Sequence, residues 1–183
     1  MMDVFVEQIV QKRKGAKEWL IICGSMLAAA FLTFFFLFIL PQFSAFVGGF
    51  SILLAAAAWY GAIWLSRSQS LEFEYAITNG DITVDKIIAR SRRKRVVSFD
   101  AQYVERMGKY RPEEHAQKDY TKQLIVSDGV PGSEEWYMAF RHKSFGNTLM
   151  VFSPNERTLE AIKPFLPRQL AFEVFGKDAF HRP

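Results

Sequence analysis

Residues 19–65 decide the architecture of this chain and read WLIICGSMLAAAFLTFFFLFILPQFSAFVGGFSILLAAAAWYGAIWL. The stretch contains no Asp, Glu, Lys or Arg, and its apolar character is interrupted only at Pro41-Gln42-Phe43-Ser44. At about 1.5 Å per residue, 19–40 and 45–65 are each long enough to cross a hydrocarbon core of about 30 Å. Pro41 lacks the amide hydrogen that helix continuation needs. We therefore predict two transmembrane helices, 19–40 and 45–65, joined by a tight turn.

The flanking charges predict the orientation of this hairpin. Lys12, Arg13, Lys14 and Lys17 precede the first span, Arg67 follows the second, and the turn carries no charge. Positive charge near membrane spans is retained in the cytoplasm, so we expect a multi-pass protein of the cell membrane with both termini cytoplasmic. A cleaved signal peptide is the alternative interpretation of the first span. Signal peptides have a shorter apolar run that is followed by a cleavage site of small residues, whereas the run here is longer and ends in Phe38-Ile39-Leu40-Pro41.

Small residues within the spans predict a packing seam. Gly24 and Ala28 are four residues apart, as are Ala57 and Gly61, and small faces let two helices approach closely. We predict that these four residues pack within the hairpin or in a homo-oligomer. The spans carry no charged side chain, which argues against a transporter, and the lone Cys23 is expected to be an apolar filler.

Residues 1–18 form a leader before the first span. Its apolar residues recur at spacings of three and four, which predicts an amphipathic cytoplasmic helix lying on the membrane or against the rest of the protein. A frayed leader that only sets the topology is the alternative. The residues of the apolar face are Met2, Phe5, Val6, Ile9 and Val10.

Residues 66–183 are long enough for one compact cytoplasmic domain. Apolar and polar residues alternate over 71–78 and resume at 81–85, and Asn79-Gly80 between them is the signature of a type I′ hairpin turn. Ser153-Pro154-Asn155-Glu156 predicts the start of a helix, capped by Ser153 and ending near Pro164. Residues beyond 166 could form a helix or a strand. We predict further strands at 95–99, 122–127, 136–141 and 148–152, and a loop at 108–119.

The pattern of antiparallel strands closed by a C-terminal helix resembles the bacterial pleckstrin-homology-like (PH-like) fold. More closely, the two spans, the segment LEFEYAITNGDI at 71–82 and the basic run at 90–95 resemble small uncharacterised bacterial membrane proteins that combine a two-span hairpin with a PH-like cytoplasmic domain. The resemblance implies a membrane α-hairpin with an α+β, mostly β, domain. It identifies no catalytic residue.

A basic run is the main candidate interaction site. Five positive charges fall within six residues at a predicted strand-to-strand turn, and each could contribute about 1 kcal/mol to contact with an anionic membrane. Anionic lipid, an acidic protein partner and a plain solvated turn all fit this run, whereas the nearly balanced charge of the rest of the domain argues against nucleic acid. The five residues are Arg90, Arg92, Arg93, Lys94 and Arg95.

No catalytic, cofactor or metal signature is present in the sequence. His115, His142 and His181 are isolated from other ligands at metal spacing, and His115 is expected in a solvated loop. The sequence also contains no phosphate-binding glycine loop and no nucleophile elbow. In the strand predicted at 136–141, alternation places Trp136, Met138 and Phe140 in the core and leaves Tyr137 for a partner surface. We therefore expect no enzyme and no cofactor.

The expected function is that of a membrane-anchored binding or scaffold protein, which presents its cytoplasmic module to a protein or an anionic lipid. The alternative is a small structural or regulatory subunit of a membrane complex that acts through its hairpin. The sequence leaves open the partner, the oligomeric state and the pathway.

Overall fold

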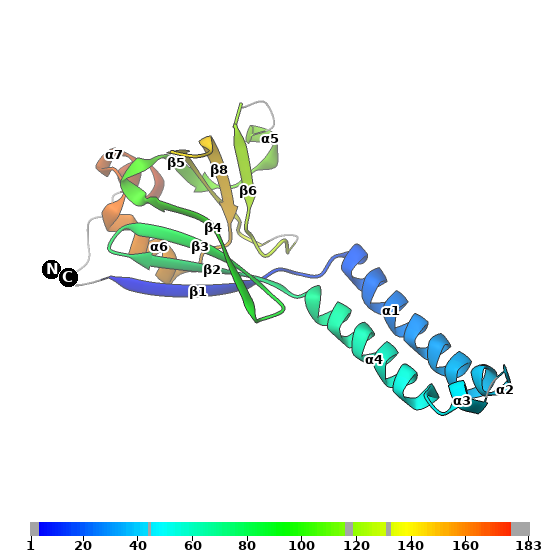
Figure 1. The fold of residues 1–183 in the computed structure, drawn as a ribbon. Helices are drawn as coiled ribbons and strands as arrows, with labels where there is room; N and C mark the ends of the chain where they lie inside the picture. Colours follow the sequence, from blue (N-terminus) through cyan, green and yellow to red (C-terminus); the bar gives the residue numbers. More distant parts are fainter. Residues whose placement is uncertain (1–3, 44, 116–118, 131–132, 177–183) are drawn as a thin grey trace. The chain divides into compact units, whose positions relative to one another are not determined.

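The computed structural model describes residues 4–43, 45–115, 119–130 and 133–176. The chain forms two compact units. The first, called here the β unit, contains Met1–Arg13, Glu72–Ile87 and Arg92–Pro183. The second, the hairpin unit, contains Lys14–Leu71 and Ile88–Ser91. The hairpin is thus an insertion into a domain that begins before it and continues after it (Figure 1).

Two four-stranded sheets build the β unit. The first sheet has the order β1-β2-β3-β4 and the second the order β5-β7-β8-β6. Strand β6 runs parallel to β8, which differs from the antiparallel arrangement that the sequence predicted. The strands of the first sheet are β1 (Phe5–Gln11), β2 (Leu71–Thr78), β3 (Asp81–Ile88) and β4 (Arg92–Asp100). Those of the second are β5 (Val104–Lys109), β6 (Lys122–Ile125), β7 (Trp136–His142) and β8 (Gly146–Phe152).

The leader prediction was wrong, because residues 5–11 form strand β1 and not an amphipathic helix. Strand β1 pairs antiparallel with β2, with Phe5 opposite Thr78 and Gln11 opposite Glu72. Side-chain exposure alternates along the strand, with Val6, Gln8 and Val10 less exposed than their neighbours. This is the period of a strand and not that of a helix. The predicted boundary at residue 18 therefore falls beyond a strand that belongs to the β unit.

The predicted turn at Asn79-Gly80 is confirmed, with φ of 49° and 96°. The Asn79 side chain also accepts a hydrogen bond from the Val4 backbone N–H (3.0 Å), which fixes the start of β1. A side chain at position 80 would meet the ring of Phe165 at 3.0 Å, so glycine is required there both for its conformation and for this close approach.

Helix α6 (Glu156–Ile162) follows the second sheet and starts two residues later than predicted. Its cap is Asn155, whose side chain accepts from the Thr158 N–H (2.8 Å), and not Ser153. The helix ends before Pro164, as expected, in a short 3₁₀ turn (Lys163–Phe165). The segment that the sequence left open then forms helix α7 (Arg168–Phe175).

Tyr75 on β2 joins the two sheets inside the core. Its hydroxyl donates to the carbonyl of Val126 and accepts from the backbone N–H of Ser153 (3.3 Å). Burial is the main cause that raises the pKa of Tyr75 above its ordinary value. Of the predicted core residues, Met138 and Phe140 are fully buried, whereas Trp136 is half-buried and stacks on Phe175.

The hairpin unit is helical almost throughout. Contrary to the prediction, the first helix does not stop at Pro41: helical geometry continues from Ala16 to Phe43. A π-helical turn precedes the proline, with the N–H of Leu40 donating to the carbonyl of Phe35, and such a widened turn accommodates a residue that has no amide hydrogen. The elements are α1 (Ala16–Phe34), the π turn (Phe35–Ile39), α2 (Leu40–Phe43), α3 (Ala45–Gly48) and α4 (Ser51–Ser68).

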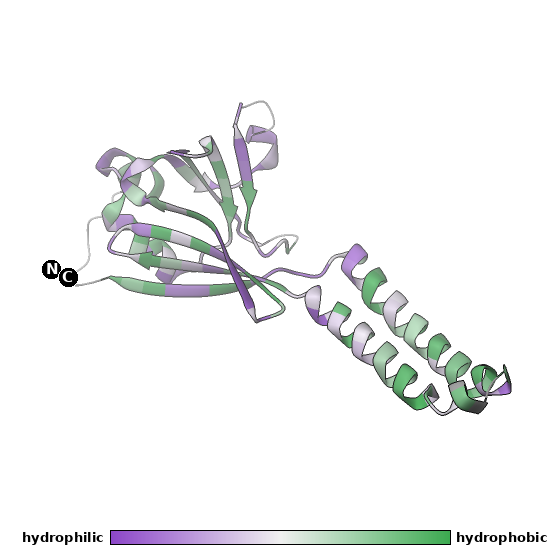
Figure 2. Cartoon of the chain, in the orientation of Figure 1, coloured by the Kyte–Doolittle hydropathy of each residue, from purple (hydrophilic) through white to green (hydrophobic). Residues whose placement is uncertain are grey.

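Among the described residues, one helix, Ala16–Phe43, is long and apolar enough to cross a membrane by length and composition alone. Helix α4 does not meet the same criterion; it has 18 residues and ends in Ser66-Arg67-Ser68. In Figure 2 most of the helical ribbon of the hairpin unit has the green colours of hydrophobic residues.

The two helices meet along buried alanines. Ala29 on α1 and Ala55 and Ala62 on α4 are nearly inaccessible. The indole N–H of Trp59 donates to the hydroxyl of Thr33 (2.9 Å), which itself donates to the carbonyl of Ala29 (2.7 Å). This hydrogen-bonded pair fixes the depth at which the helices face each other.

The predicted seam of Gly24, Ala28, Ala57 and Gly61 is not the contact between these helices. All four residues are exposed, and a side chain added at either glycine would meet nothing within 4 Å. Ala29, next to Ala28, and Ala62, next to Gly61, are the buried residues. Each helix is therefore rotated about its axis by about one residue from the predicted orientation.

Candidate interaction surface

The basic run begins in the turn that joins β3 to β4. Ala89 and Arg90 both have positive φ, 53° and 57°, and the Ser91 N–H donates to the Ile88 carbonyl (3.2 Å), which closes the turn. The Ala89 N–H donates to the carbonyl of Ser70 (2.9 Å). This turn therefore belongs to the hairpin unit, whereas the rest of the basic run belongs to the β unit.

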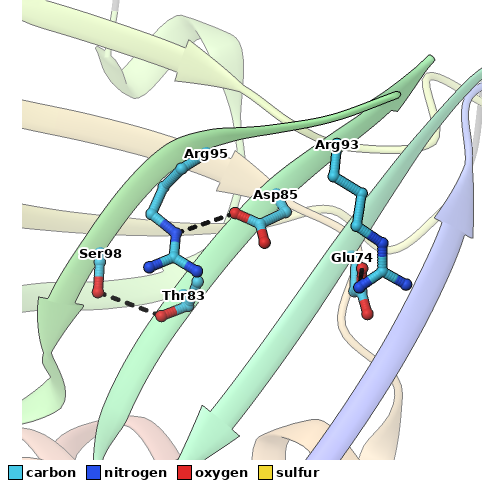
Figure 3. Close-up of polar contacts among 6 residues, drawn as sticks. All are labelled: Glu74, Thr83, Asp85, Arg93, Arg95 and Ser98. Atoms are coloured by element: carbon cyan, nitrogen blue, oxygen red, sulfur yellow. Dashed lines mark hydrogen bonds and ion pairs between the residues drawn. The ribbon is translucent and has the colours of Figure 1, made fainter. Parts of the chain in front are cut away.

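Arg93 and Arg95 form ion pairs on the face of the first sheet that points away from the core (Figure 3). Nη1 of Arg93 lies 3.2 Å from Oε2 of Glu74, and Nε of Arg95 donates to Oδ1 of Asp85 at 3.1 Å. Glu74 lies on β2 and Arg93 on β4, so the arginine side chain reaches across β3. Both arginines are therefore partly neutralised by acidic residues of their own sheet.

The two ion pairs differ in their exposure. The Arg93 and Arg95 side chains are both 63% exposed, whereas Glu74 is only 6% exposed in its side chain and Asp85 is 19% exposed. The hydrogen bond from Arg95 to Asp85 raises the pKa of the already basic guanidinium. Loss of the counter-charge should destabilise the fold more at Glu74 than at Asp85, because water reaches less of the Glu74 carboxylate.

An irregularity in β4 brings these side chains to one face. Thr83 and Asp85 are two residues apart on β3, but their partners Ser98 and Arg95 are three apart on β4. One extra residue on one strand of a pair is the property of a β-bulge. With this spacing Arg95 lies on the same face as Asp85, and Arg93 lies on that face as well (Figure 3).

The predicted five-residue site is consequently divided. Arg93 and Arg95 lie on the outer face with Glu74 and Asp85, and by strand alternation Arg92 and Lys94 point to the opposite side. Arg90 lies in the turn of the other unit. Within the β unit, Arg92 and Lys94 are therefore not on the face that carries Arg93 and Arg95.

The acidic partners were missed by the sequence reasoning, although a signal for them was present. Glu72 and Glu74 occupy the polar positions of β2, and Asp85 occupies a polar position of β3. Two hairpins in succession place these positions and the basic strand on one sheet. The register of β4 could not be counted from the sequence, because the bulge shifts it.

His115 is buried, which corrects the prediction of a solvated loop. It ends the short helix α5 (Pro112–His115), its Nδ1 lies 3.0 Å from the Tyr120 hydroxyl, and its ring packs edge-on against Tyr137 at 4.2 Å between centroids. Burial is the main cause that raises the pKa of both Tyr120 and Tyr137. Tyr137, predicted for a partner surface, thus contributes to this aromatic cluster.

The other candidate ligands remain apart. His142 stacks on Phe145 at 4.7 Å, and Cys23 is an exposed residue of the hairpin unit. His181 lies outside the described residues. Within the part of the chain that the structure describes, no group of three or more His, Cys, Asp or Glu residues is placed to hold a metal ion.

Two sheets closed by C-terminal helices define the β unit as a PH-like domain. Residues 2–172 match the family model described as Bacterial PH-like domain (DUF6106), and the chain therefore belongs to this family. The matched residues include β1, the hairpin and both sheets. No curated protein and no solved structure matches the chain. A PH-like domain is a binding or scaffold module, of a kind that commonly binds lipids or proteins.

Proposed function

We propose that this chain is a non-enzymatic, membrane-anchored binding or scaffold protein. Its PH-like domain is carried on a two-span helical hairpin inserted between β1 and β2, with both termini in the cytoplasm. The partner is an anionic lipid headgroup or a membrane protein, and neither nucleic acid nor a cofactor is involved. Homo-oligomers through the hairpin are compatible with this role.

One observation carries the proposal: the hairpin unit has large apolar side chains on its outside and small ones on its inside. A soluble protein rarely exposes contiguous apolar surface of this size, because its contact with water is unfavourable. Lipid chains would cover it, and the helices satisfy their own backbone groups as a membrane span requires. The exposed residues include Leu20, Leu27, Phe31 and Phe38 on the first helical segment and Ile52, Leu53, Tyr60 and Ile63 on α4.

The second span of the proposed hairpin consists of α3 and α4. Helix α4 is short, but α3 precedes it, and residues 45–65 carry no charge. If only the first helix crossed the membrane, the apolar helix α4 would lie in water. The buried alanines and the Trp59–Thr33 hydrogen bond instead hold α4 against α1. A hairpin that enters the membrane as one body accounts for both helices.

Cysteine accessibility in intact cells tests this topology. In a full-length Cys23→Ala background, Gln42→Cys in the helical turn and Lys143→Cys in the β unit provide one thiol each. A membrane-impermeant maleimide should label the first variant in intact cells and the second only after lysis. Labelling of both variants, or of neither, before lysis would contradict a two-span hairpin with cytoplasmic termini.

Alkaline carbonate extraction of membranes provides the second measurement. The full-length chain should stay in the membrane pellet, as an integral protein does. Release into the supernatant would show that the apolar hairpin is covered by protein and not by lipid.

The second candidate function is a small structural or regulatory subunit that acts through its hairpin. The observation that favours it is that Gly24, Ala28, Ala57 and Gly61 are all exposed and remain open to another helix. Replacing the hairpin with an unrelated two-span hairpin separates the two functions. Retained activity favours the scaffold, and lost activity with intact membrane location favours the subunit.

A further inference from the structure

The turn at Ala89-Arg90 uses residues that its conformation does not favour. Both residues lie in the left-handed region, where the side chain of a non-glycine residue is crowded. The other tight turn of the same sheet uses Asn79-Gly80, the pair that suits this geometry. The chain therefore keeps an arginine at a position where glycine or asparagine would be more stable.

A backbone hydrogen bond places this arginine beside the end of the hairpin. The Ala89 N–H donates to Ser70, which lies two residues after the last residue of α4. From Arg67 to Ser70 the extended chain spans at most about 10 Å. Arg90 is therefore held near the C-terminal end of α4 by the backbone, independently of its own side chain.

All charged residues of the hairpin unit lie at this one end. The unit contains four basic residues and one acidic residue, Glu18, a net charge of +3. The Glu18 carboxylate accepts a hydrogen bond from the Gly15 N–H (3.0 Å) at the start of α1. The four basic residues, called here the basic collar, are Lys14, Lys17, Arg67 and Arg90.

Exposed tryptophans lie next to the basic collar. Trp19 lies two residues after Lys17, and Trp64 lies three residues before Arg67. Both tryptophans are more than half exposed. Amphipathic rings of this kind settle at the headgroup level of a bilayer. The basic residues, the indoles and the apolar side chains thus follow one another in the same order as the anionic headgroups, the interface and the acyl chains of a phospholipid leaflet.

We propose that the basic collar binds the headgroup of an anionic phospholipid, with Arg90 positioned for it by the strained turn. The inference rests on the proposed insertion of the hairpin into a membrane. It assigns lipid contact to the basic collar of the hairpin unit. Free phosphate would not use the adjoining indoles and apolar surface, so a lipid is the expected source of the anion.

Tryptophan quenching by brominated lipids tests this in the full-length protein. The chain is reconstituted in nanodiscs that contain equal amounts of phosphatidylglycerol and phosphatidylcholine, with bromine on one lipid or on the other. Stronger quenching by brominated phosphatidylglycerol measures its enrichment around the exposed tryptophans of the hairpin unit, Trp19, Trp59 and Trp64. The wild-type protein should show this enrichment, and 10 mM inorganic phosphate should not abolish it.

The decisive variants change Arg90 alone. Arg90→Gly removes the charge and suits the turn, so it cannot act by preventing folding, and we expect the enrichment to fall about fivefold, as for the loss of about 1 kcal/mol per charge. Arg90→Lys should keep most of the enrichment. Arg95→Gln removes a charge from the sheet and should leave it unchanged.

Three results would overturn the inference. Equal quenching by the two lipids in the wild type would show that the collar has no lipid preference, and equal losses in Arg90→Gly and Arg95→Gln would show a general effect of net charge. Abolition by inorganic phosphate would identify a free anion as the ligand. Each result is separable from failure of the proposed function, because in that case the chain would be released from membranes by carbonate.

Discussion

Gln8 on the first strand and Thr158 on the closing helix share a hydrogen bond across 150 residues of sequence: the Thr158 hydroxyl donates to the Gln8 side-chain oxygen at 2.7 Å. The same oxygen accepts from the Asn155 N–H (2.9 Å), and the Gln8 amide group donates to the Ser153 carbonyl (2.9 Å). One side chain thus joins the strand before the hairpin to the start of α6. The domain is complete only when the residues on both sides of the hairpin are present.

Removing the Gln8 side chain should destabilise the domain. Gln8→Ala leaves two partly buried polar groups, the Thr158 hydroxyl and the Ser153 carbonyl, and the exposed Asn155 N–H without this partner, and we expect a loss of about 1–3 kcal/mol in the free energy of unfolding. Urea unfolding of the full-length chain, followed by far-UV circular dichroism, measures the change. Gln11→Ala, an exposed position on the same strand, is the matched control, and equal midpoints for both variants would contradict the prediction.

Replacing the hairpin by a turn should give a soluble, folded domain. Because Gln11 lies opposite Glu72 in the register of β1 and β2, an Asn-Gly pair between Arg13 and Ser70 can close a short hairpin loop. We expect cooperative unfolding of this protein in water. A version that also lacks residues 1–13 should fail to unfold cooperatively; if it behaves like the version with β1, the strand is dispensable.

The buried Tyr75 should make stability fall at alkaline pH. Its pKa is raised in the folded state, so folding favours the protonated hydroxyl. The stability that this preference contributes is fully present below the unfolded pKa of about 10. It is lost as the pH rises above 10 toward the higher folded pKa. The free energy of unfolding, measured between pH 8 and 11, should therefore decline.

Tyr75→Phe provides the comparison for that measurement. It leaves the Val126 carbonyl and the Ser153 N–H without the hydroxyl, so we expect a loss of about 1–3 kcal/mol at pH 8 and a smaller further decline above pH 10. Tyr103→Phe changes an exposed tyrosine and should keep the wild-type profile. Parallel profiles for Tyr75→Phe and the wild type would rule out Tyr75 as the titrating group.

The Trp59–Thr33 hydrogen bond should stabilise the hairpin in detergent. Trp59→Phe and Thr33→Val each remove one partner, and interhelical hydrogen bonds in membranes contribute about 0.6–1.7 kcal/mol. A double-mutant cycle, measured by unfolding in mixed micelles, isolates the interaction, and Trp64→Phe serves as the control. Additive effects of the two substitutions would show that the hydrogen bond contributes nothing.

Arg93 should matter more for stability than its neighbour Arg92. Arg93→Gln leaves the poorly hydrated Glu74 carboxylate without its counter-charge, and we expect a loss of about 1–2 kcal/mol, less than for a fully buried pair because the guanidinium is mostly solvated. Arg92→Gln should change the stability by less than about 0.5 kcal/mol. Equal effects in thermal unfolding would mean that the two residues share one environment.

Several elements were predictable because the relevant physics is local. Asn79-Gly80 favours one turn, and the alternation on either side of it predicts a two-stranded hairpin whatever the rest of the chain does. The uncharged segment 19–65 likewise predicts apolar helices from composition alone. Strands β7 and β8 were recognised for the same reason, whereas β5 was largely missed because its apolar pattern is weak.

Other features depend on partners that are distant in the sequence. Phe5, Val6, Ile9 and Val10 fit a helical face, and only pairing with β2 makes them a strand. Similarly, Gly24 and Gly61 looked like the natural contact between two helices, but the rotation of each helix is set by how whole surfaces pack, and Ala29 and Ala62 occupy the seam.

The basic run shows the same division most clearly. Its charge, its position between strands and its proximity in sequence to an apolar hairpin follow directly from the order of residues. Its division between the two units, with Arg93 and Arg95 on the sheet of the β unit and Arg90 in the turn of the hairpin unit, was decided by tertiary structure. The reason is that a bulge sets which side of a strand a residue faces, and a hydrogen bond to Ser70 sets where the turn lies, and neither leaves a local pattern in the sequence.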